Sequence, residues 1–362
     1  MRFYEMMINW LTLLTVAGLF CTGAKGVAVA DRVPRMVPAS LILLPDTAPH
    51  ALVVDKSRQE LYLYEKKENT LIRQAVLPCS TGEAAGDKQV EGDRKTPEGV
   101  YFFTDRHPEK YLSPVYGRMA FPMDYPNLMD LRGEKTGSAI WLHGTNKPIR
   151  PRNSNGCVVL DNPHIEWIAS RITLNRTPIV VSETVAYVTA QQVADLADQL
   201  TAFIDGWQAA LITEAPEAYP AFYEAGWYAR VTWPFEWQAV RDRMKAAGDA
   251  VGLEYHALSL CQHKDHVVAL FDQVMTAGDV RVDVGRRKLF IRMSGEQLSI
   301  VGDVFQSAWE AADTRGHEGG RLLVSAARYL EGRLQAHLEL SRARRAAEKT
   351  PVSDLGSSRA VY

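Results

Sequence analysis

Two short apolar runs, separated by a polar, glycine-containing stretch, constrain the fold of this chain more than any other feature. Residues 139–142 are apolar and lead into His143, and residues 158–160 are apolar and follow directly after Cys157. Short apolar runs bounded by polar turns are typical of buried strands, so both reactive side chains are expected where a strand meets a loop. Proteins commonly hold catalytic groups at such places.

The histidine and the cysteine suit a thiol nucleophile with its general base. A free thiol is mostly protonated near neutral pH, and an imidazole that accepts the proton converts it to the nucleophilic thiolate. Gly156 has no Cβ and permits a tight turn before the cysteine, so the N–H groups of Gly156 and Cys157 are expected to face a developing oxyanion. His143 precedes Cys157 in the chain, whereas a papain-type enzyme has its cysteine first and its histidine far downstream.

Two other interpretations fit the same residues. A cysteine at the start of an apolar strand is commonly a small buried hydrophobic residue, and a histidine can be a satisfied core residue. A zinc site formed by His143, Cys157 and His164 is a further alternative, although the chain has no Cys-x-x-Cys or His-x-x-x-His pair to support it. We expect neither a metal nor an organic cofactor.

The arrangement resembles the signature of the YkuD-type L,D-transpeptidases of bacterial cell walls. In that family a histidine followed by glycine precedes a Ser/Thr-x-Gly-Cys signature by about this distance, and His143-Gly144 and Ser154-Asn155-Gly156-Cys157 occupy those places. Residues 51–64 resemble the family's opening hairpin, and residues 92–101 contain its Thr-Pro-x-Gly turn. These separated matches make the resemblance specific over roughly residues 51–181.

Two positions depart from the family's common form. Asn155 stands where the family has histidine, and Val159 stands where it often has arginine. Asn155 still offers a hydrogen-bond donor and acceptor, but Val159 offers nothing polar. A contact that binds or orients the acyl acceptor is therefore in question at Val159.

The resemblance implies a reaction on the tetrapeptide stems of peptidoglycan. Cys157 attacks the carbonyl of the penultimate diamino acid, the terminal D-alanine leaves, and a thioester forms, while His143 accepts the thiol proton. A backbone carbonyl or a small polar residue such as Ser138 is expected to orient the imidazole. The expected substrate-binding residues lie around this pair: Gly144, Thr145, Ser154, Asn155 and Tyr116.

Three functions remain open at this point. Transfer of the acyl group to an amine makes the protein an L,D-transpeptidase, and the family resemblance favours it. Transfer to water makes it an L,D-carboxypeptidase that trims tetrapeptides to tripeptides, which the missing arginine at Val159 favours. The third alternative is a non-catalytic wall-binding module with a vestigial cysteine.

The N-terminus has the features of a secretory signal peptide over residues 1–30. The apolar stretch at residues 8–20 is too short to span a bilayer comfortably and is followed by Ala28-Val29-Ala30. We expect export to the periplasm as a soluble or wall-associated protein, with an uncleaved anchor as the alternative. The net charge of −2 gives no indication of a nucleic-acid partner. Cys79 and Cys261 are expected to be buried small residues rather than a disulfide.

The remaining chain is predicted to be α+β. After a lead segment at residues 31–50, strand-like alternation predicts a mostly β catalytic domain over residues 51–183. Residues 191–310 are expected to form a second domain, with helices followed by strands, similar to the NTF2-like domains that follow YkuD domains in some cell-shape enzymes. Its first predicted helix is amphipathic and runs from Gln191 to about Ile212, and its second covers residues 219–228.

Aromatic residues concentrate in this second domain. A core accounts for them better than a glycan or peptide pocket, because aromatics at helical spacing usually pack inward. The residues are Trp207, Tyr219, Tyr223, Trp227, Trp233 and Trp237. His256, His263 and His266 are expected to be ordinary residues rather than metal ligands.

The last part of the chain is predicted to be a long amphipathic helix over residues 320–349, followed by a disordered tail at residues 350–362. Leucines recur along one stripe of this helix. We expect it to pack on a domain, on a protein partner or on a second copy of the chain.

Overall fold

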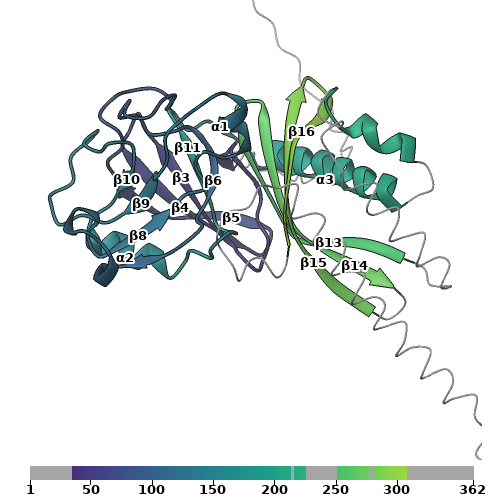
Figure 1. Ribbon diagram of the computed structural model, residues 1–362, viewed down its shortest axis with the longest axis horizontal. Helices are drawn as coiled ribbons and strands as arrows, with labels where there is room; N and C mark the ends of the chain where they lie inside the picture. The colour runs from purple at the N-terminus through teal and green to yellow at the C-terminus, as the bar shows by residue number, and fades with distance from the viewer. Residues whose placement is uncertain (1–34, 213–215, 226–250, 278–279, 308–362) are drawn as a thin grey trace, which may run out of the picture. The chain divides into compact units, whose positions relative to one another are not determined.

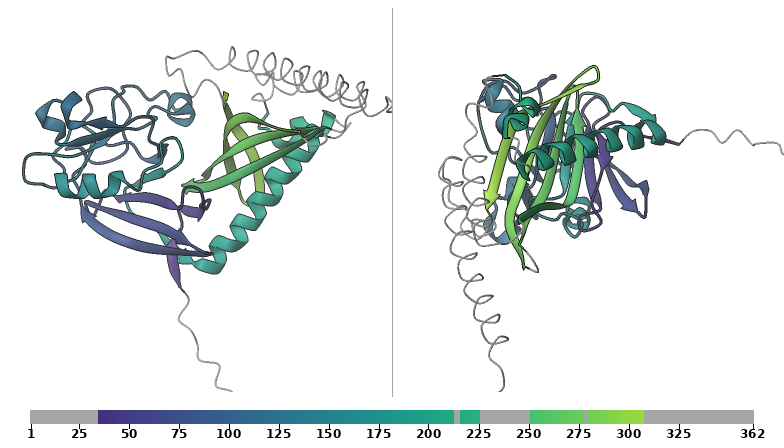
Figure 2. Two further views of the ribbon diagram at one scale, coloured as in Figure 1. Left: turned by 90° about the horizontal axis from the view of Figure 1, so that it is seen from below. Right: turned by 90° about the vertical axis from the view of Figure 1, so that its right-hand side faces the viewer.

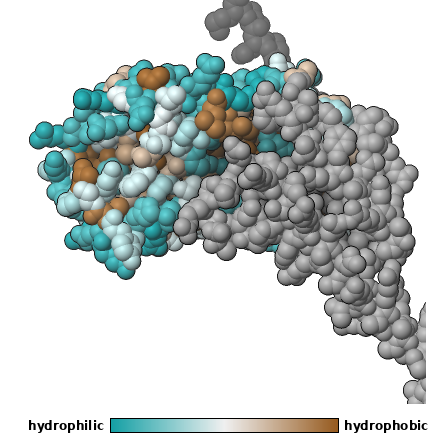
Figure 3. Space-filling model, viewed as in Figure 1, coloured by the Kyte–Doolittle hydropathy of each residue, from teal (hydrophilic) through white to brown (hydrophobic). Residues whose placement is uncertain are grey.

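The computed structural model describes residues 35–212, 216–225, 251–277 and 280–307 (Figure 1). The predicted signal peptide, C-terminal helix and tail lie outside these residues. Within the described ranges, none of the helices is both long and apolar enough to cross a lipid bilayer. On the face drawn in Figure 3, apolar residues form separate patches among hydrophilic ones.

A five-stranded sheet forms the centre of the first domain, in the order β5-β4-β3-β11-β6. Its strands are β3 (His50–Asp55), β4 (Glu60–Lys67), β5 (Thr70–Pro78), β6 (Gly99–Phe102) and β11 (Pro178–Ser182). Strands β3 and β4 form the predicted antiparallel hairpin.

Both faces of this sheet are covered, which explains why β3 is apolar at consecutive positions. Leu52 and Val54 belong to a core cluster that also contains Leu142 and Val158, the apolar neighbours of His143 and Cys157. Ala51 and Val53, on the other face, belong to a cluster that includes Phe290. Side chains alternate between the two faces of a sheet along each strand. The side chains of residues 51–54 can therefore all be buried only because other elements pack against both faces.

A smaller four-stranded sheet has the order β10-β9-β8-β7. It consists of β7 (His107–Pro108), β8 (Met119–Pro122), β9 (Trp141–His143) and β10 (Val158–Val159). Helix α2 (Asn162–Ala169) buries Ile165 and Ile168 in the same cluster as Leu142 and Val158. Asp161 caps the N-terminus of this helix, because its side chain accepts a hydrogen bond from the backbone N–H of His164 at 2.9 Å.

The stretch before β9 contains several short elements. These are the 3-10 helices η1 (Glu109–Tyr111) and η2 (Pro114–Tyr116), strand β8, and helix α1 (Leu128–Arg132). A capping box between Asn127 and Asp130 starts α1.

The second domain consists of a long helix and an antiparallel sheet in the order β16-β15-β14-β13-β2. Its strands are β13 (Val251–His263), β14 (His266–Ala277), β15 (Val280–Ser294) and β16 (Gln297–Ser307), and β2 (Leu41–Leu43) comes from the segment predicted as a lead. From the same segment, β1 (Met36–Pro38) pairs with β12 (Tyr187–Thr189). The predicted α+β layout is confirmed.

Helix α3 (Ala190–Ile212) lies along this sheet (Figures 1 and 2). It buries Leu200, Ile204, Trp207 and Leu211, which recur at three- and four-residue spacing, against Phe271 and its neighbours in the sheet. The predicted amphipathic helix is confirmed. Trp207, Tyr219 and Tyr223 are core residues, as favoured from their spacing, whereas Trp227, Trp233 and Trp237 lie outside the described residues.

The second predicted helix of this domain was wrong in type. Residues Pro216–Phe222 form a 3-10 helix, η3, and Tyr223 makes a bridge to Ile300 instead of continuing it. Pro220 lies inside η3 and has no N–H to donate, so an α-helical hydrogen-bond ladder is interrupted there.

Candidate active site

His143 and Cys157 are brought together by two adjacent parallel strands. In the register of β9 and β10, Val158 pairs with Leu142 and Val159 pairs with His143. Leu142 and Val158 point into the core, so His143 and Val159 point to the opposite face. Cys157, two residues before Val159, lines the same cavity as both of them.

The imidazole of His143 is buried and held by a backbone carbonyl. Its Nδ1 lies 2.6 Å from the carbonyl oxygen of Gly144, and only 6 % of the residue is exposed. A carbonyl oxygen only accepts hydrogen bonds, so Nδ1 is the protonated nitrogen of the neutral ring. Nε2 is then free to accept a proton, which is the tautomer that a general base requires.

The ring of Tyr116 packs against this imidazole. The two ring centroids are 5.0 Å apart in an edge-to-face arrangement, and Tyr116 also lies 4.8 Å from the ring of Trp141. Burial lowers the pKa of His143 below its ordinary value, and the Gly144 carbonyl opposes that shift. The histidine is therefore neutral, and able to act as a base, at neutral pH.

The Cys157 thiol is partly exposed and lies close to backbone oxygen. Its Sγ is 3.7 Å from the carbonyl oxygen of Ala139, near the start of β9. Burial raises the pKa of this thiol, whereas a backbone hydrogen bond at Trp141 and the charge of Lys88 lower it. The resting pair is thus a neutral thiol beside a neutral imidazole, and proton transfer accompanies attack.

The turn before Cys157 needs glycine. Gly156 has a φ of +126°, and a Cβ there would lie 2.8 Å from the carbonyl oxygen of Lys95. The Ser154 hydroxyl donates to the carbonyl of Cys157 at 2.6 Å and accepts from the N–H of Gly156 at 3.1 Å. The expectation that the Gly156 N–H faces an oxyanion is therefore wrong for this structure, because a side-chain acceptor inside the turn already takes that donor.

The buried side chain of Gln59 connects the loops that contain Thr81 and Arg152. Its side-chain oxygen accepts from the N–H groups of Thr81 at 3.0 Å and Arg152 at 2.7 Å, and its amide donates to Lys56 and to Thr81. The residue is buried in a turn with a φ of 57°. No local pattern in the sequence distinguishes it from an exposed glutamine.

His143 and Cys157 both line a cavity of about 400 Å³. Of the residues expected to bind substrate, Tyr116, Thr145, Ser154 and Asn155 line this cavity. Gly144 and Gly156 are buried and are not among the residues that line the cavity. At Gly144 a Cβ would lie 2.5 Å from the side-chain oxygen of Asn162, so close packing against α2 accounts for this glycine.

Sequence reasoning missed several members of the cavity. Most lie in the loop between the two signature segments or just after β5, where residue type alone gives little signal. They are Ser80, Glu83, Val115, Lys147, Pro148, Ile149, Arg150 and Asn153.

Two alternatives raised by the sequence are not found in the geometry. Ser138 is exposed, and the imidazole is oriented by the Gly144 carbonyl, which was the other expected means. His164 lies on α2 with its Nδ1 2.9 Å from Asp161 and does not line the cavity with His143 and Cys157. Among the described residues, no group of three or more His, Cys, Asp or Glu side chains is placed to hold a metal ion.

The other two cysteines of the described chain are separate from this site. Cys79 and Cys261 are unpaired and buried in different clusters, as expected from the sequence. Burial raises the pKa of each thiol to about 12. Neither is therefore a reactive thiolate at neutral pH.

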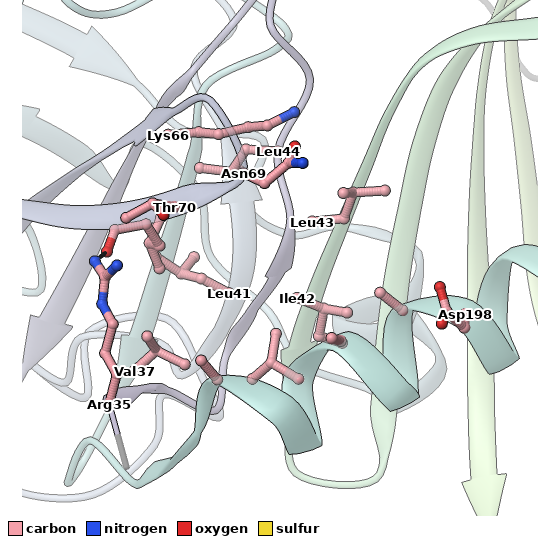
Figure 4. A pocket seen from close by; sticks show the side chains of 15 residues that line it. Arg35, Val37, Leu41, Ile42, Leu43, Leu44, Lys66, Asn69, Thr70 and Asp198 are labelled. Atoms are coloured by element: carbon pink, nitrogen blue, oxygen red, sulfur yellow. Dashed lines mark hydrogen bonds between the residues drawn. The ribbon is translucent and has the colours of Figure 1, made fainter. Parts of the chain in front are cut away.

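A larger cavity, of about 640 Å³, lies between β1, β2, the turn after β4 and helix α3 (Figure 4). Its wall is largely aliphatic and includes Leu41, Ile42 and Leu43 of β2, and the charged residues Arg35, Lys66 and Asp198 also line it. Neither His143 nor Cys157 contributes to it. Its size alone therefore does not make it the reactive site.

Comparisons with known proteins agree with this geometry. Residues 49–181 match the family model of the YkuD L,D-transpeptidase catalytic domain. The chain is 29% identical over 160 residues to the probable L,D-transpeptidase YbiS of Escherichia coli K12, and 28% identical over 160 residues to the probable L,D-transpeptidase ErfK/SrfK of the same strain. These matches cover 42% of this chain and 51% and 50% of the relatives, so the chain spans about half of their length.

Two solved structures are similar over a larger share of the chain. Bd1075 of Bdellovibrio bacteriovorus has a TM-score of 0.63 at 27% identity and covers 75% of this chain and 99% of its own. The helical cell shape determining protein Pgp2 of Campylobacter jejuni has a TM-score of 0.56 at 20% identity, covering 73% and 94% respectively, and shares the fold. Residues 49–181, with His143 and Cys157 in the signature positions, are thus similar to the catalytic domain of the YkuD L,D-transpeptidase family.

Proposed function

We propose that the protein is an exported cysteine acyltransferase that acts on tetrapeptide stems of peptidoglycan. The observation that supports this most directly is the His143 tautomer, fixed by the Gly144 carbonyl, in the cavity that Cys157 also lines. A neutral imidazole with a free Nε2 beside a thiol is the arrangement that nucleophilic catalysis by cysteine requires.

In the first step, Cys157 Sγ forms a bond to the carbonyl carbon of the penultimate residue as its proton passes to His143. The carbon–nitrogen bond to D-alanine then breaks, and the imidazolium returns the proton to the leaving amine. The oxyanion of the tetrahedral intermediate needs a donor, and we assign this role to the Cys157 N–H, because the Gly156 N–H is engaged by Ser154.

In the second step, an amine of another stem attacks the thioester carbon and gives up a proton to His143. The carbon–sulfur bond then breaks, the proton returns to the Cys157 thiolate, and the two stems are cross-linked. Thr145, Ser154 and Asn155 in the cavity wall are suited to hold peptide groups of the donor or acceptor. Among the residues that the structure describes, none from the second domain, which we propose is NTF2-like, lines the cavity.

Hydrolysis of the thioester is the second candidate outcome. Val159 lines the cavity and is paired with His143, so the wall is apolar at a place where the family often has arginine. An acceptor stem therefore has one polar contact fewer at this position than in an enzyme with arginine there, whereas a water molecule does not need that contact to attack the thioester.

Digestion of purified sacculi by the full-length protein, followed by separation of muropeptides, tests the proposal. A transpeptidase converts tetrapeptides to L,D-cross-linked dimers with release of D-alanine, and a carboxypeptidase converts them to tripeptides. Cys157→Ala should give neither product, whereas Cys261→Ala, a change of a buried thiol outside the cavity, should behave as wild type. Unchanged muropeptides after treatment with wild type would contradict the proposal.

A further inference from the structure

The loop between His143 and Cys157 places two cations in the wall of the catalytic cavity. Lys147 and Arg150 are exposed and line the cavity together with Cys157. Within the part of the chain that the structure describes, neither side chain forms an ion pair. The nearby Arg152, by contrast, is paired with Glu183 at 3.1 Å.

The cavity has a single carboxylate among its lining residues, Glu83, and that carboxylate is already neutralised. Arg94 Nη1 lies 2.6 Å from Glu83 Oε2. With this charge compensated, the lining near Cys157 has an excess of positive charge supplied by Lys147 and Arg150. Such a cavity attracts an anionic ligand.

The loop that presents the two cations is fixed at both ends. Asn146 donates to the carbonyl of Pro114 at 3.1 Å and accepts from Asn162 at 2.7 Å, and the N–H of Asn153 donates to Ser80 at 2.9 Å. Pro148 and Pro151 restrict φ in the segment between these anchors. Less conformational entropy is therefore lost when the cations bind a ligand.

We propose that Lys147 and Arg150 bind a free carboxylate of the donor stem peptide and so make the enzyme selective for stems that retain it. This rests on the proposed function. A tetrapeptide stem has such a carboxylate on its terminal D-alanine, directly beyond the bond that Cys157 attacks, and it has a second one if the diamino acid bears an acidic side chain. Val159, apolar in the same wall, supplies no charge, so the loop supplies it instead.

The test compares Arg150→Gln, Lys147→Gln and the double variant of the full-length protein on soluble disaccharide tetrapeptides. Each single variant should raise KM about ten- to a hundred-fold with little change in kcat, since hydrogen bonds to charged groups contribute about 1.5–3 kcal/mol. Lys110→Gln, which removes an exposed cation that does not line the cavity, is the matched control and should behave as wild type.

Substrates amidated at one carboxylate identify which group is bound. If the terminal carboxamide binds wild type and Arg150→Gln equally weakly, the D-alanine carboxylate is the ligand. If instead the substrate amidated on the diamino acid side chain binds wild type and Arg150→Gln equally weakly, the side-chain carboxylate of the diamino acid is the ligand. Equal losses by the variants on free acids and on both amides would overturn the proposal, and so would KM values matching wild type.

Binding without turnover separates this inference from the proposed function. Calorimetry of the tetrapeptide with Cys157→Ala, and with the same variant also changed at Arg150 or Lys147, needs no catalysis. Weaker binding by the doubly changed proteins supports the carboxylate site even if wild type proves inactive on sacculi. Identical affinities contradict it even if wild type is active.

Discussion

Val159 pairs directly with His143 across the parallel strands β9 and β10. This pairing fixes the distance along the sheet between the general base and the nucleophile two residues before Val159. It also means that the position where the family often has arginine lies beside the catalytic histidine. Any change of register between these strands would separate the pair, because a one-residue shift moves side chains to the opposite face.

The first prediction concerns pH. Burial lowers the pKa of His143, so its imidazole stays neutral below the ordinary value of 6.5. As pH falls through the lowered pKa, the ring gains a proton and can no longer accept one from Cys157. The rate of Cys157 acylation should therefore persist below pH 6.5 and then decline. The rate of acylation is measured by quenching the reaction at set times across pH 4–8. A fall in this rate on acidification that is centred above pH 6.5 would be inconsistent with a buried neutral base.

The second prediction concerns Gly156→Ala. The added Cβ would lie 2.8 Å from a backbone oxygen of Lys95, in a conformation that L-residues rarely adopt. We expect a loss of about 1–3 kcal/mol in the free energy of unfolding together with a large loss of acylation. Denaturant unfolding and acylation are measured side by side. Gly92→Ala is a useful comparison, because Gly92 also has a positive φ but no atom within 4 Å of the place that a Cβ would take; equal effects of both changes on acylation would argue against a special role for the 156 turn.

The third prediction concerns thiol reactivity. Cys79 and Cys261 are buried with pKa values raised to about 12, whereas Cys157 is partly exposed beside a base. Iodoacetamide near neutral pH should label Cys157 well before the other two, as followed by peptide mass spectrometry. In His143→Gln, which retains a polar side chain but no base, labelling of Cys157 should slow markedly. An unchanged labelling rate would show that another group activates the thiol.

The fourth prediction concerns truncation at residue 190. Strand β2 pairs with β13, and Ala51 and Val53 share a cluster with Val268 and Phe290. Removing the second domain exposes this apolar face, so the fragment should unfold at a lower temperature than the full-length protein and bind hydrophobic dyes. Differential scanning calorimetry of both proteins checks the prediction. A fragment as stable as the whole chain would show that the face is not needed for the fold.

Much of this architecture could be predicted from sequence patterns because its signals are local. The hairpin of β3 and β4 follows from two short apolar runs joined by a polar turn, and the long helix α3 follows from a periodicity of 3.6 residues. The positions of His143 and Cys157 at strand ends follow from the apolar runs beside them.

The parts that could not be predicted depend on contacts distant in sequence. The pairing of β2 with β13 joins segments about 220 residues apart, and nothing in Leu41–Leu43 indicates its partner. Gln59 holds Thr81 and Arg152, neither of which is near it in sequence. Likewise, the Gly156 N–H was assigned to an oxyanion because a sequence does not show that the Ser154 hydroxyl turns back to accept it.

The most direct test of the account is the intact mass of the full-length protein after incubation with a tetrapeptide donor or a carbapenem. Covalent catalysis predicts one added acyl group, located on the peptide that contains Cys157 and absent from Cys157→Ala. The same adduct should form slowly or not at all in His143→Gln. An unmodified wild-type protein, or an equal adduct on Cys157→Ala, would contradict the assignment of Cys157 as the nucleophile.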